Sequence, residues 1–446
     1  MGIIRYLLDH FVWVCLAITA LFVGRQIQMR NAQQALGKKM LKKAIESNNG
    51  EPVTLHPLID PALCIGCGAC TTACPEGDIL KLINHKAVLV SPTKCVGHGE
   101  CERACPMDAI SLVFGTKTRG MDIPRVTTNY ESNIPGLYLT GEIGGMGLIR
   151  NAVRQGRAAA EHAIAKLNPG VKADYDAIVV GLGPAGFSAA LKFHEKKMSY
   201  RAIDQNSFGG TIANFPRQKL VMSHPFDLPM VGPTKFKGNT ASKEQIMDFW
   251  RSTRSQTGLK IYEGERFESV DTGQTPFKIK TSAGEFTAHK LVLAVGVRGS
   301  PRRLGVPGED SAKVTYNLID PEQYRGQNIV VVGGGNAGAE VAQMLAKKGL
   351  QNKVKLLVRG KAFDRCNDDN QARLQALKAK GQLEILFNSS IESITPKTVV
   401  IVQDGAKSEP PNDFVFVLAG AELPHKFLMS IGVKIDKKFE EGLSRA

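Results

Sequence analysis

The sequence predicts an α/β protein with two similar strand–turn–helix units, a small cysteine-rich α+β domain and an N-terminal apolar helix. Three observations predict this arrangement. Apolar strands run directly into glycine-rich turns at two places, near residues 177–186 and 329–338. Seven of the nine cysteines lie between Cys64 and Cys105. The run from Phe11 to Gly24 is uncharged and mostly apolar.

The composition allows several folded domains. The chain has 446 residues, of which 43% are hydrophobic, and its formal charge is +15. This length suggests roughly two to four domains, and the hydrophobic content is sufficient for their cores. The positive charge favours an anionic membrane, anionic cofactors or an acidic redox partner. We expect no nucleic-acid partner, because no helix combines clustered arginines with interleaved aromatic side chains.

The N-terminal apolar run predicts a membrane anchor over residues 1–28. It is shorter than the roughly 20 apolar residues that a spanning helix needs. However, Arg25, Arg30 and four lysines follow it, and no small-residue cleavage site precedes them. Positive charge on this side predicts that the bulk of the protein lies in the cytoplasm. A basic helix and linker are expected over 29–54, and a buried or partner-contacting amphipathic helix stays the alternative to an anchor.

The first glycine turn has the spacing of a dinucleotide-binding motif. Its three glycines would allow a tight turn, a close backbone approach and close packing of a helix on a strand, so that a pyrophosphate could bind at the helix N-terminus. An acid ends the next apolar strand about 20 residues on, where a ribose 2′-hydroxyl needs an acceptor. A glycine loop in another kind of α/β domain is the plainer alternative. The candidate residues are Gly181, Gly183, Pro184, Ala185, Gly186 and Asp204.

The second glycine turn repeats this pattern about 150 residues later, which predicts a second dinucleotide-binding domain. Its next strand, Val354 to Val358, is followed by basic residues instead of an acid. Guanidinium groups in this place favour a 2′-phosphate, and therefore NADPH, with NADH still possible. A solvated basic face is the alternative. The candidate residues are Gly333, Gly335, Asn336, Gly338, Arg359, Lys361 and Arg365.

The cysteines form two runs, each ending in Cys-Pro, whose spacing is typical of iron-sulfur ligands. Residues 55–116 resemble the bacterial two-cluster ferredoxins. The resemblance implies one 4Fe-4S cluster on Cys64, Cys67, Cys70 and Cys105, and a second cluster on Cys74, Cys95 and Cys101. His98 replaces the second cysteine of the second run. It is either the fourth ligand of a 4Fe-4S cluster or no ligand, which leaves a 3Fe-4S cluster; zinc is the alternative for the whole set.

Further segments resemble the FAD domain of the thioredoxin reductase family. Residues 208–216 resemble its flavin-contacting loop, although a simple turn is the alternative, and 291–296 its crossover into the pyridine-nucleotide domain. Residues 120–168 resemble its last segment, with Glu142 where the family has aspartate. The resemblance implies flavin contacts by Gly141, Glu142, Gly209, Gly210, Thr211, Asn214, Ala294 and Gly296.

The order of these segments predicts a circular permutation. Residues 120–168 precede the FAD-binding domain at 173–300 instead of following it. An NAD(P)H-binding domain is expected at 301–408, and residues 409–446 should return to the FAD domain, beside residues 118–130. The predicted fold class is therefore two Rossmann-like domains of the glutathione and thioredoxin reductase type, circularly permuted, with a ferredoxin-like domain and an N-terminal transmembrane helix.

These features predict an enzyme that moves electrons between NADPH, FAD, two iron-sulfur clusters and a protein or small-molecule partner. No catalytic side chain is expected, because the cofactors perform the redox chemistry. Thioredoxin reductases carry a redox-active Cys-x-x-Cys, but residues 310–345 contain no cysteine and Cys366 stands alone. Two alternatives stay open, a flavin-dependent reductase of a small disulfide or other small substrate, and a redox sensor or electron-transfer subunit without turnover. A homodimer is also open.

Overall fold

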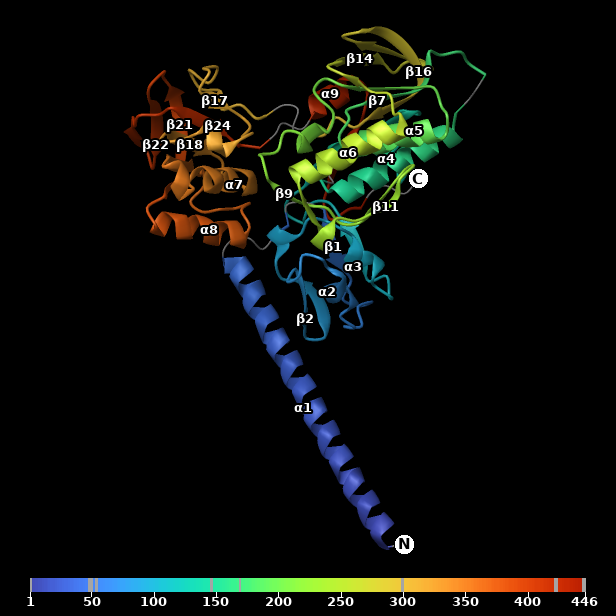
Figure 1. Ribbon diagram of the computed structural model, residues 1–446, viewed down its shortest axis with the longest axis vertical. Helices are drawn as coiled ribbons and strands as arrows, with labels where there is room; N and C mark the ends of the chain where they lie inside the picture. The colour runs from blue at the N-terminus through green and yellow to red at the C-terminus, as the bar shows by residue number, and fades with distance from the viewer. Residues whose placement is uncertain are drawn as a thin grey trace. The chain divides into compact units, whose positions relative to one another are not determined.

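The computed structural model describes residues 2–46, 51–52, 55–144, 147–167, 170–297, 301–420 and 424–442 (Figure 1). The chain divides into two compact units, Met1–Val113 and Phe114–Ala446. The predicted domain edges at 54, 168, 300 and 446 lie outside the described residues.

The first unit begins with helix α1 (Gly2–Glu46), which is one continuous helix instead of an anchor followed by a separate basic helix. Among the described residues, one helix is long and apolar enough to cross a membrane, namely residues 10–46. The later part of α1 lies beside strand β2 (Figure 1). Gln34 donates a hydrogen bond to Asn84 over 3.1 Å, and a Cβ on Gly37 would lie 3.0 Å from Lys81 Cβ. This close approach needs the small residue at position 37.

The cysteine-rich part of this unit contains two short helices and two antiparallel strand pairs. The outer strands pair along their whole length, with His56 opposite Val113. Its core combines aliphatic side chains with buried thiols. The elements are β1 (His56–Ile59), α2 (Ala69–Ala73), β2 (Leu80–Ile83), β3 (Lys86–Leu89), α3 (Glu100–Arg103) and β4 (Ile110–Val113).

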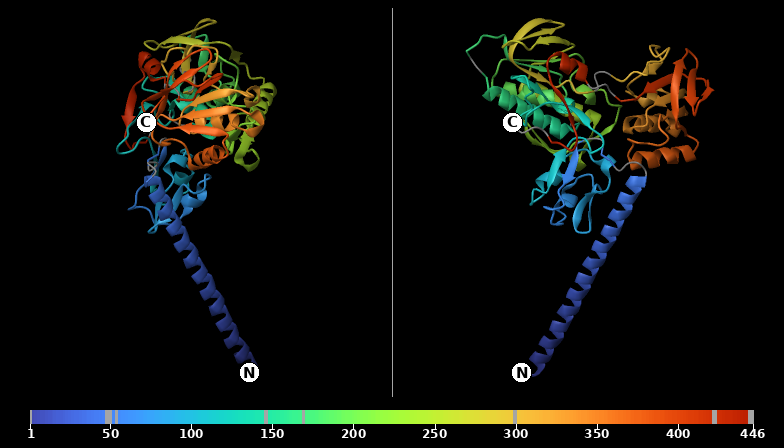
Figure 2. Two further views of the ribbon diagram at one scale, coloured as in Figure 1. Left: turned by 90° about the vertical axis from the view of Figure 1, so that its left-hand side faces the viewer. Right: turned by 180° about the vertical axis from the view of Figure 1, so that it is seen from behind.

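The two largest sheets of the second unit form separate lobes (Figure 2). The first has seven strands in the order β13-β8-β7-β16-β15-β14, with β6 paired to β16. Strands β13, β8, β7, β16 and β6 run parallel, and β15 and β14 continue antiparallel. The strands are β6 (Leu137–Leu139), β7 (Tyr175–Val180), β8 (Tyr200–Asp204), β13 (Tyr262–Glu263), β14 (Phe267–Asp271), β15 (Phe277–Thr281) and β16 (Gly284–Leu293).

Helices α4 (Ile149–Ala165) and α5 (Pro184–Glu195) pack against each other in this lobe, and α6 (Lys243–Thr257) lies nearby (Figure 1). Two antiparallel strand pairs lie between α5 and α6. Strand β9 (Leu220–Met222) pairs with β12 (Thr240–Ser242), and the hairpin of β10 (Phe226–Leu228) and β11 (Gly232–Thr234) lies between them in the chain.

The second lobe has a five-stranded parallel sheet in the order β17-β24-β18-β19-β20. Helices α7 (Asn336–Leu345) and α8 (Asp368–Ala379) pack on it, and a three-stranded antiparallel sheet adjoins it. The parallel strands are β17 (Val314–Thr315), β18 (Asn328–Val332), β19 (Lys353–Leu357), β20 (Leu383–Leu386) and β24 (Phe414–Val417). The antiparallel strands are β21 (Ser389–Ile394), β22 (Val399–Gln403) and β23 (Ala406–Ser408).

The predicted boundary at 408/409 needs a correction. Strand β24 lies in the second lobe, where its apolar run pairs with β18 and β17, and does not return to the first lobe. The return follows residue 420, because α9 (His425–Ser430) supplies Leu428 to the core of the first sheet, which Ile431 and Val433 also join. Three buried apolar residues thus mark where the chain changes lobes.

The last strand, β25 (Ile435–Lys438), pairs antiparallel with β5 (Met121–Pro124). Arg125 joins the pair by an ion pair to Asp436, whose N–O distance is 2.7 Å. The expected adjacency of the C-terminal segment and residues 118–130 is therefore confirmed. The permutation that motivated this expectation stays a prediction.

Candidate cofactor sites

The first glycine turn, between β7 and α5, has the backbone that a phosphate-binding turn requires. Gly181 adopts φ +93°, and a Cβ there would lie 2.5 Å from Ala294 O. A Cβ on Gly186 would lie 1.8 Å from Gly181 O, so the helix packs directly on the turn. At Gly183, by contrast, no described atom lies within 4 Å of that position. The turn is closed on its protein side and open at the helix N-terminus, where an anion is stabilised.

A cavity of ≈690 Å³ opens from this turn. Its volume falls in the range of cofactor pockets. Twelve of the predicted flavin residues line it: Gly141, Glu142, Gly181, Gly183, Pro184, Ala185, Asp204, Gly210, Thr211, Asn214, Ala294 and Gly296. Gly186 and Gly209 do not line the cavity. Gly209 adopts φ +113° and donates its amide to Leu182 O over 3.1 Å, so it shapes the loop.

Residues 137–142 reach the cavity beside the glycine turn. Strand β6 pairs with the end of β16, and a Cβ on Gly141 would lie 3.2 Å from Ala185 Cβ. The Gly141 amide donates to Gln155 Oε1 over 2.6 Å, and Gln155 is fully buried on α4. The sequence reasoning missed Gln155, although a glutamine among the small apolar residues of a helix face is a detectable signal.

Asp204 holds the turn from the end of β8. Its Oδ2 accepts the Leu182 amide over 2.7 Å and its Oδ1 accepts the Asn206 amide over 2.9 Å. Burial raises the pKa of Asp204, and the two amide hydrogen bonds oppose that rise. Each carboxylate oxygen keeps a second lone pair. Asp204 can therefore brace the turn and also accept a ribose hydroxyl, as expected from its position.

Apolar side chains without any motif complete the cavity. Val221 and Met222 line it from β9, and Phe427 lines it from α9. The Phe427 ring packs edge-on against Phe267, another lining residue, with 5.8 Å between centroids. The sequence reasoning missed these residues because hydrophobic side chains in loops and short strands carry no spacing signal.

The second glycine turn, between β18 and α7, repeats the geometry of the first. Gly333 adopts φ +140°, and a Cβ there would lie 2.3 Å from Leu418 O. A Cβ on Gly338 would lie 2.1 Å from Gly333 O. At Gly335 the described residues leave the corresponding space open. This turn can therefore approach a second dinucleotide in the same way.

The other residues predicted at the second turn lie around it. Asn336 Oδ1 accepts the Asn367 amide over 2.9 Å, which ties α7 to the next loop. Arg359 and Lys361 are exposed just beyond β19, next to β18. Arg365 is exposed and its backbone forms a bridge to Gly335. The basic residues thus follow the strand that neighbours the turn, as a 2′-phosphate site would require.

The first four candidate iron ligands come together in the first unit. Cys64, Cys67, Cys70 and Cys105 line one small cavity. Burial, followed by the charges of the other three thiols, raises the pKa of Cys70 to about 11. Iron binds thiolates, so cluster insertion must displace protons from such thiols.

The second set of thiols lies close by and is more buried. Burial raises the pKa of Cys95 to about 11 and that of Cys101 to about 12, and the neighbouring Cys74 thiol contributes to both shifts. Cys366 is fully buried in the other unit, and Cys15 is exposed on α1. The structure therefore groups the thiols as the resemblance implied, while what they bind stays a prediction.

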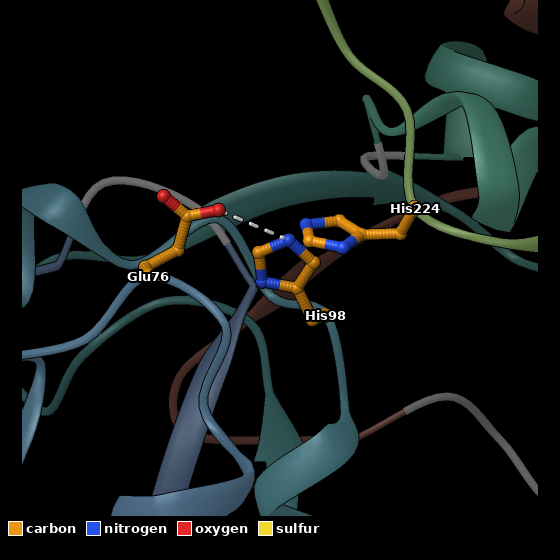
Figure 3. A group of neighbouring side chains, drawn as sticks. All are labelled: Glu76, His98 and His224. Atoms are coloured by element: carbon orange, nitrogen blue, oxygen red, sulfur yellow. Dashed lines mark ion pairs between the residues drawn. The ribbon is translucent and has the colours of Figure 1, made fainter. Parts of the chain in front are cut away.

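His98 is 7% exposed, and its Nε2 lies 3.3 Å from Glu76 Oε1 (Figure 3). Glu76 is a residue that the sequence reasoning missed. Its position two residues after Cys74 was the available signal.

Comparisons with known proteins identify both parts of the chain. Residues 178–443 match the pyridine nucleotide-disulphide oxidoreductase family, and residues 56–106 match the 4Fe-4S dicluster domain. Bacilliredoxin reductase Bdr of Bacillus subtilis is 29% identical over 59% of this chain and 82% of that protein. A ferredoxin–NADP reductase of Ignicoccus hospitalis is 28% identical over 59% and 83%. The structure of bacillithiol disulfide reductase Bdr from Bacillus cereus is similar with a TM-score of 0.53 and 25% identity, over 59% of this chain and 82% of that one.

Proposed function

Because this chain belongs to the pyridine nucleotide-disulphide oxidoreductase family and carries a 4Fe-4S dicluster domain, we propose that it moves electrons between NADPH, FAD, two iron-sulfur clusters and a redox partner. It is a flavin-dependent oxidoreductase similar to thioredoxin and ferredoxin–NADP reductases. One observation carries the finer proposal. Two sets of thiols are grouped in the chain, whereas residues 310–345 lack cysteine and Cys366 is fully buried. The clusters are therefore the electron exit.

The first lobe holds the FAD. Bound flavin accepts two electrons from a nicotinamide and can release them one at a time, which side chains cannot do. The chain supplies binding and orientation: the α5 N-terminus for the pyrophosphate, Asp204 for the ribose and Glu142 for the flavin side. The open space at Gly183 and the twelve lining residues support this assignment.

The second lobe holds NADPH. Its turn has the same pattern of two closed glycines and one open glycine as the first. The exposed Arg359, Lys361 and Arg365 supply positive charge for a 2′-phosphate. That a relative is named a ferredoxin–NADP reductase supports NADPH, with NADH as the weaker alternative.

Helix α1 anchors the enzyme to a membrane, with the remainder in the cytoplasm. The length and composition of residues 10–46 support this location. The basic residues after the apolar run support the orientation. The redox partner is a protein or a small molecule that reaches the enzyme from the cytoplasmic side of the membrane.

The flavoprotein part is circularly permuted relative to thioredoxin reductases. Two contacts support this proposal: β6 pairs with β16 beside the flavin cavity, and β25 pairs with β5. Strand β6, which precedes the first glycine turn in the chain, thus completes the sheet of the first lobe, and the last strand, β25, pairs with β5 just before β6.

The test is anaerobic mixing of the purified full chain with NADPH. Flavin absorbance should bleach first, and the cluster signals in electron paramagnetic resonance should appear afterwards. Flavin that bleaches while both clusters stay oxidised would contradict the electron exit. Absence of bleaching with either nucleotide would instead favour a sensor or electron-transfer subunit without turnover.

A second candidate is direct reduction of a small disulfide at the flavin. The likeness to bacilliredoxin reductase Bdr favours it. Cys64→Ser and Cys101→Ser distinguish the two functions. Cluster exit predicts that both variants lose NADPH-dependent reduction of a one-electron acceptor protein, whereas direct reduction predicts unchanged turnover of a low-molecular-weight disulfide.

A further inference from the structure

We propose that His98 is the fourth iron ligand of the second cluster, through Nδ1, and that Glu76 positions its ring through Nε2. The inference rests on one part of the proposed function, namely that the cysteine-rich domain binds two clusters. It decides between the two cluster types that the sequence left open, and it assigns a role to Glu76.

The backbone around His98 repeats that around Cys67. The glycines before and after Cys67 adopt φ values of +70° and +80°, and those around His98 adopt +71° and +80°. In each case the second glycine is the N-cap of a short helix, α2 or α3, with ψ near zero. Glycine adopts this left-handed backbone without strain, so both loops can follow the same path around the residue between the glycines. His98 therefore occupies the backbone position that carries a ligand in the first set.

Neighbouring backbone holds both loops in place. A Cβ on Gly66 would lie 2.1 Å from His85 O, and a Cβ on Gly97 would lie 2.7 Å from Leu55 O. The His98 carbonyl also accepts a hydrogen bond from Arg103 Nη2 over 3.3 Å. A simple surface turn does not need these restraints, whereas a ligand loop must hold its side chain at a set distance from iron.

The side chain of His98 is buried beside Glu76, which follows the candidate ligand Cys74 by two residues. It is 7% exposed, and its ring faces Glu76 (Figure 3). Glu76 follows Cys74 in the chain, and His98 lies between Cys95 and Cys101. The contact between Glu76 and His98 therefore joins the two loops that carry the second set of ligands.

Glu76 can orient the His98 ring for iron binding. A histidine that binds metal through one nitrogen usually donates its other N–H to a carboxylate, which orients the ring and sets the tautomer. With Nε2 at 3.3 Å from Glu76 Oε1, iron binding uses Nδ1. Neutral imidazole in place of thiolate makes the second cluster less negative and easier to reduce. Electrons should therefore collect on the second cluster.

The deciding experiment uses the full-length wild-type protein, purified without oxygen and labelled with ¹⁵N-histidine. Pulsed electron paramagnetic resonance of the reduced protein should show a strongly coupled nitrogen on one cluster, changed by the label. Iron content should equal two four-iron clusters, and the oxidised protein should lack a three-iron signal. Absence of a histidine coupling, or a stoichiometric three-iron signal, would overturn the proposal.

Variants at position 98 extend the test. His98→Cys should keep the full iron content, lose the nitrogen coupling and lower the midpoint potential of the second cluster. His98→Ala should lose one iron and gain the three-iron signal. His10→Ala, at an exposed position of α1, is the control and should change neither. An unchanged second cluster in His98→Ala would refute ligation, and if that variant does not fold, the labelled wild type still decides.

Glu76→Gln tests the positioning role. The amide oxygen can still accept from Nε2 but is uncharged, so the nitrogen coupling should persist and the midpoint potential of the second cluster should rise. Asp78→Asn removes a nearby carboxylate that is exposed and paired with Lys81. If both variants shift the potential equally, Glu76 has no specific role. None of these spectra requires NADPH, so failure of NADPH to bleach the flavin would contradict the proposed function and leave the ligand assignment intact.

Discussion

Gly156→Ala should destabilise the flavin-binding lobe, although alanine ordinarily favours a helix. Within α4, replacing glycine by alanine would contribute up to about 1 kcal/mol of stability from backbone entropy alone. In this fold, however, the new Cβ would lie 1.9 Å from Ala185 O and 2.8 Å from Ala185 C. Real Cβ atoms stay at least 3.0 Å from such atoms, so α4 and α5 must separate by about 1 Å.

The cost of this separation should exceed the helix gain. Overpacking in a well-packed core costs about 1–3 kcal/mol, and a clash with backbone belongs at the upper end because no rotamer relieves it. The net loss should be about 1–2 kcal/mol. Ala185 and Ala152 line the cofactor cavity from the two helices, so both walls should shift. If the shift of the walls weakens the free energy of FAD binding by about 1.4 kcal/mol, the affinity for FAD falls tenfold.

The assay is titration of apoprotein with FAD by flavin fluorescence, together with thermal unfolding of the FAD-free protein. Gly349→Ala is the control, because no described atom lies within 4 Å of its Cβ position. It should leave both quantities nearly unchanged. An unfolding midpoint that is equal or higher in Gly156→Ala, with unchanged FAD affinity, would show that the two helices are not packed this closely.

Three further predictions follow from the sites. Gly186→Ala should purify with at least tenfold less FAD, whereas Gly338→Ala should retain FAD and show a KM for NADPH raised at least tenfold, because each new Cβ meets backbone of its own turn. Arg359→Asp should raise the KM for NADPH about tenfold or more and that for NADH far less, since charge-assisted hydrogen bonds contribute about 1.5–3 kcal/mol. The protection factor of the β25 amides against hydrogen exchange should fall as the pH falls below about 4, because hydrogen bonding to Arg125 lowers the pKa of Asp436 and stabilises the pair only while that carboxylate is ionised.

Each of these predictions has a control. Equal loss of FAD in both glycine variants would mean that the two turns do not bind different nucleotides. Lys380→Asp, an exposed charge change at the end of α8, should not discriminate between NADPH and NADH. Asp436→Asn should abolish the acid dependence of the β25 protection factors, and an unchanged pH dependence of protection in that variant would assign the effect to another group.

Residues whose role is local could be identified from the sequence. Four of the six glycines in the two turns meet backbone where a Cβ would not fit, and the other two, Gly183 and Gly335, leave the space open that a cofactor can approach; these needs appear as a fixed spacing within a few residues. The cysteine runs are informative for the same reason, since one cluster takes three ligands from one short loop. Asp204 could be identified because β8 neighbours β7, which fixes its distance from the turn along the chain.

Residues that act across long sequence separations appeared only in the tertiary structure. Gln155 reaches back to Gly141, Phe427 meets Phe267, and Glu76 meets His98, and none of these pairs has a spacing that sequence could reveal. Strand β24 is a short apolar run that either lobe could have accepted, and its pairing with β18 decided the boundary. A sequence motif reflects the backbone conformation that one short segment must adopt. Which distant segments then come into contact depends on packing across the whole fold, and short spacings in the sequence do not report it.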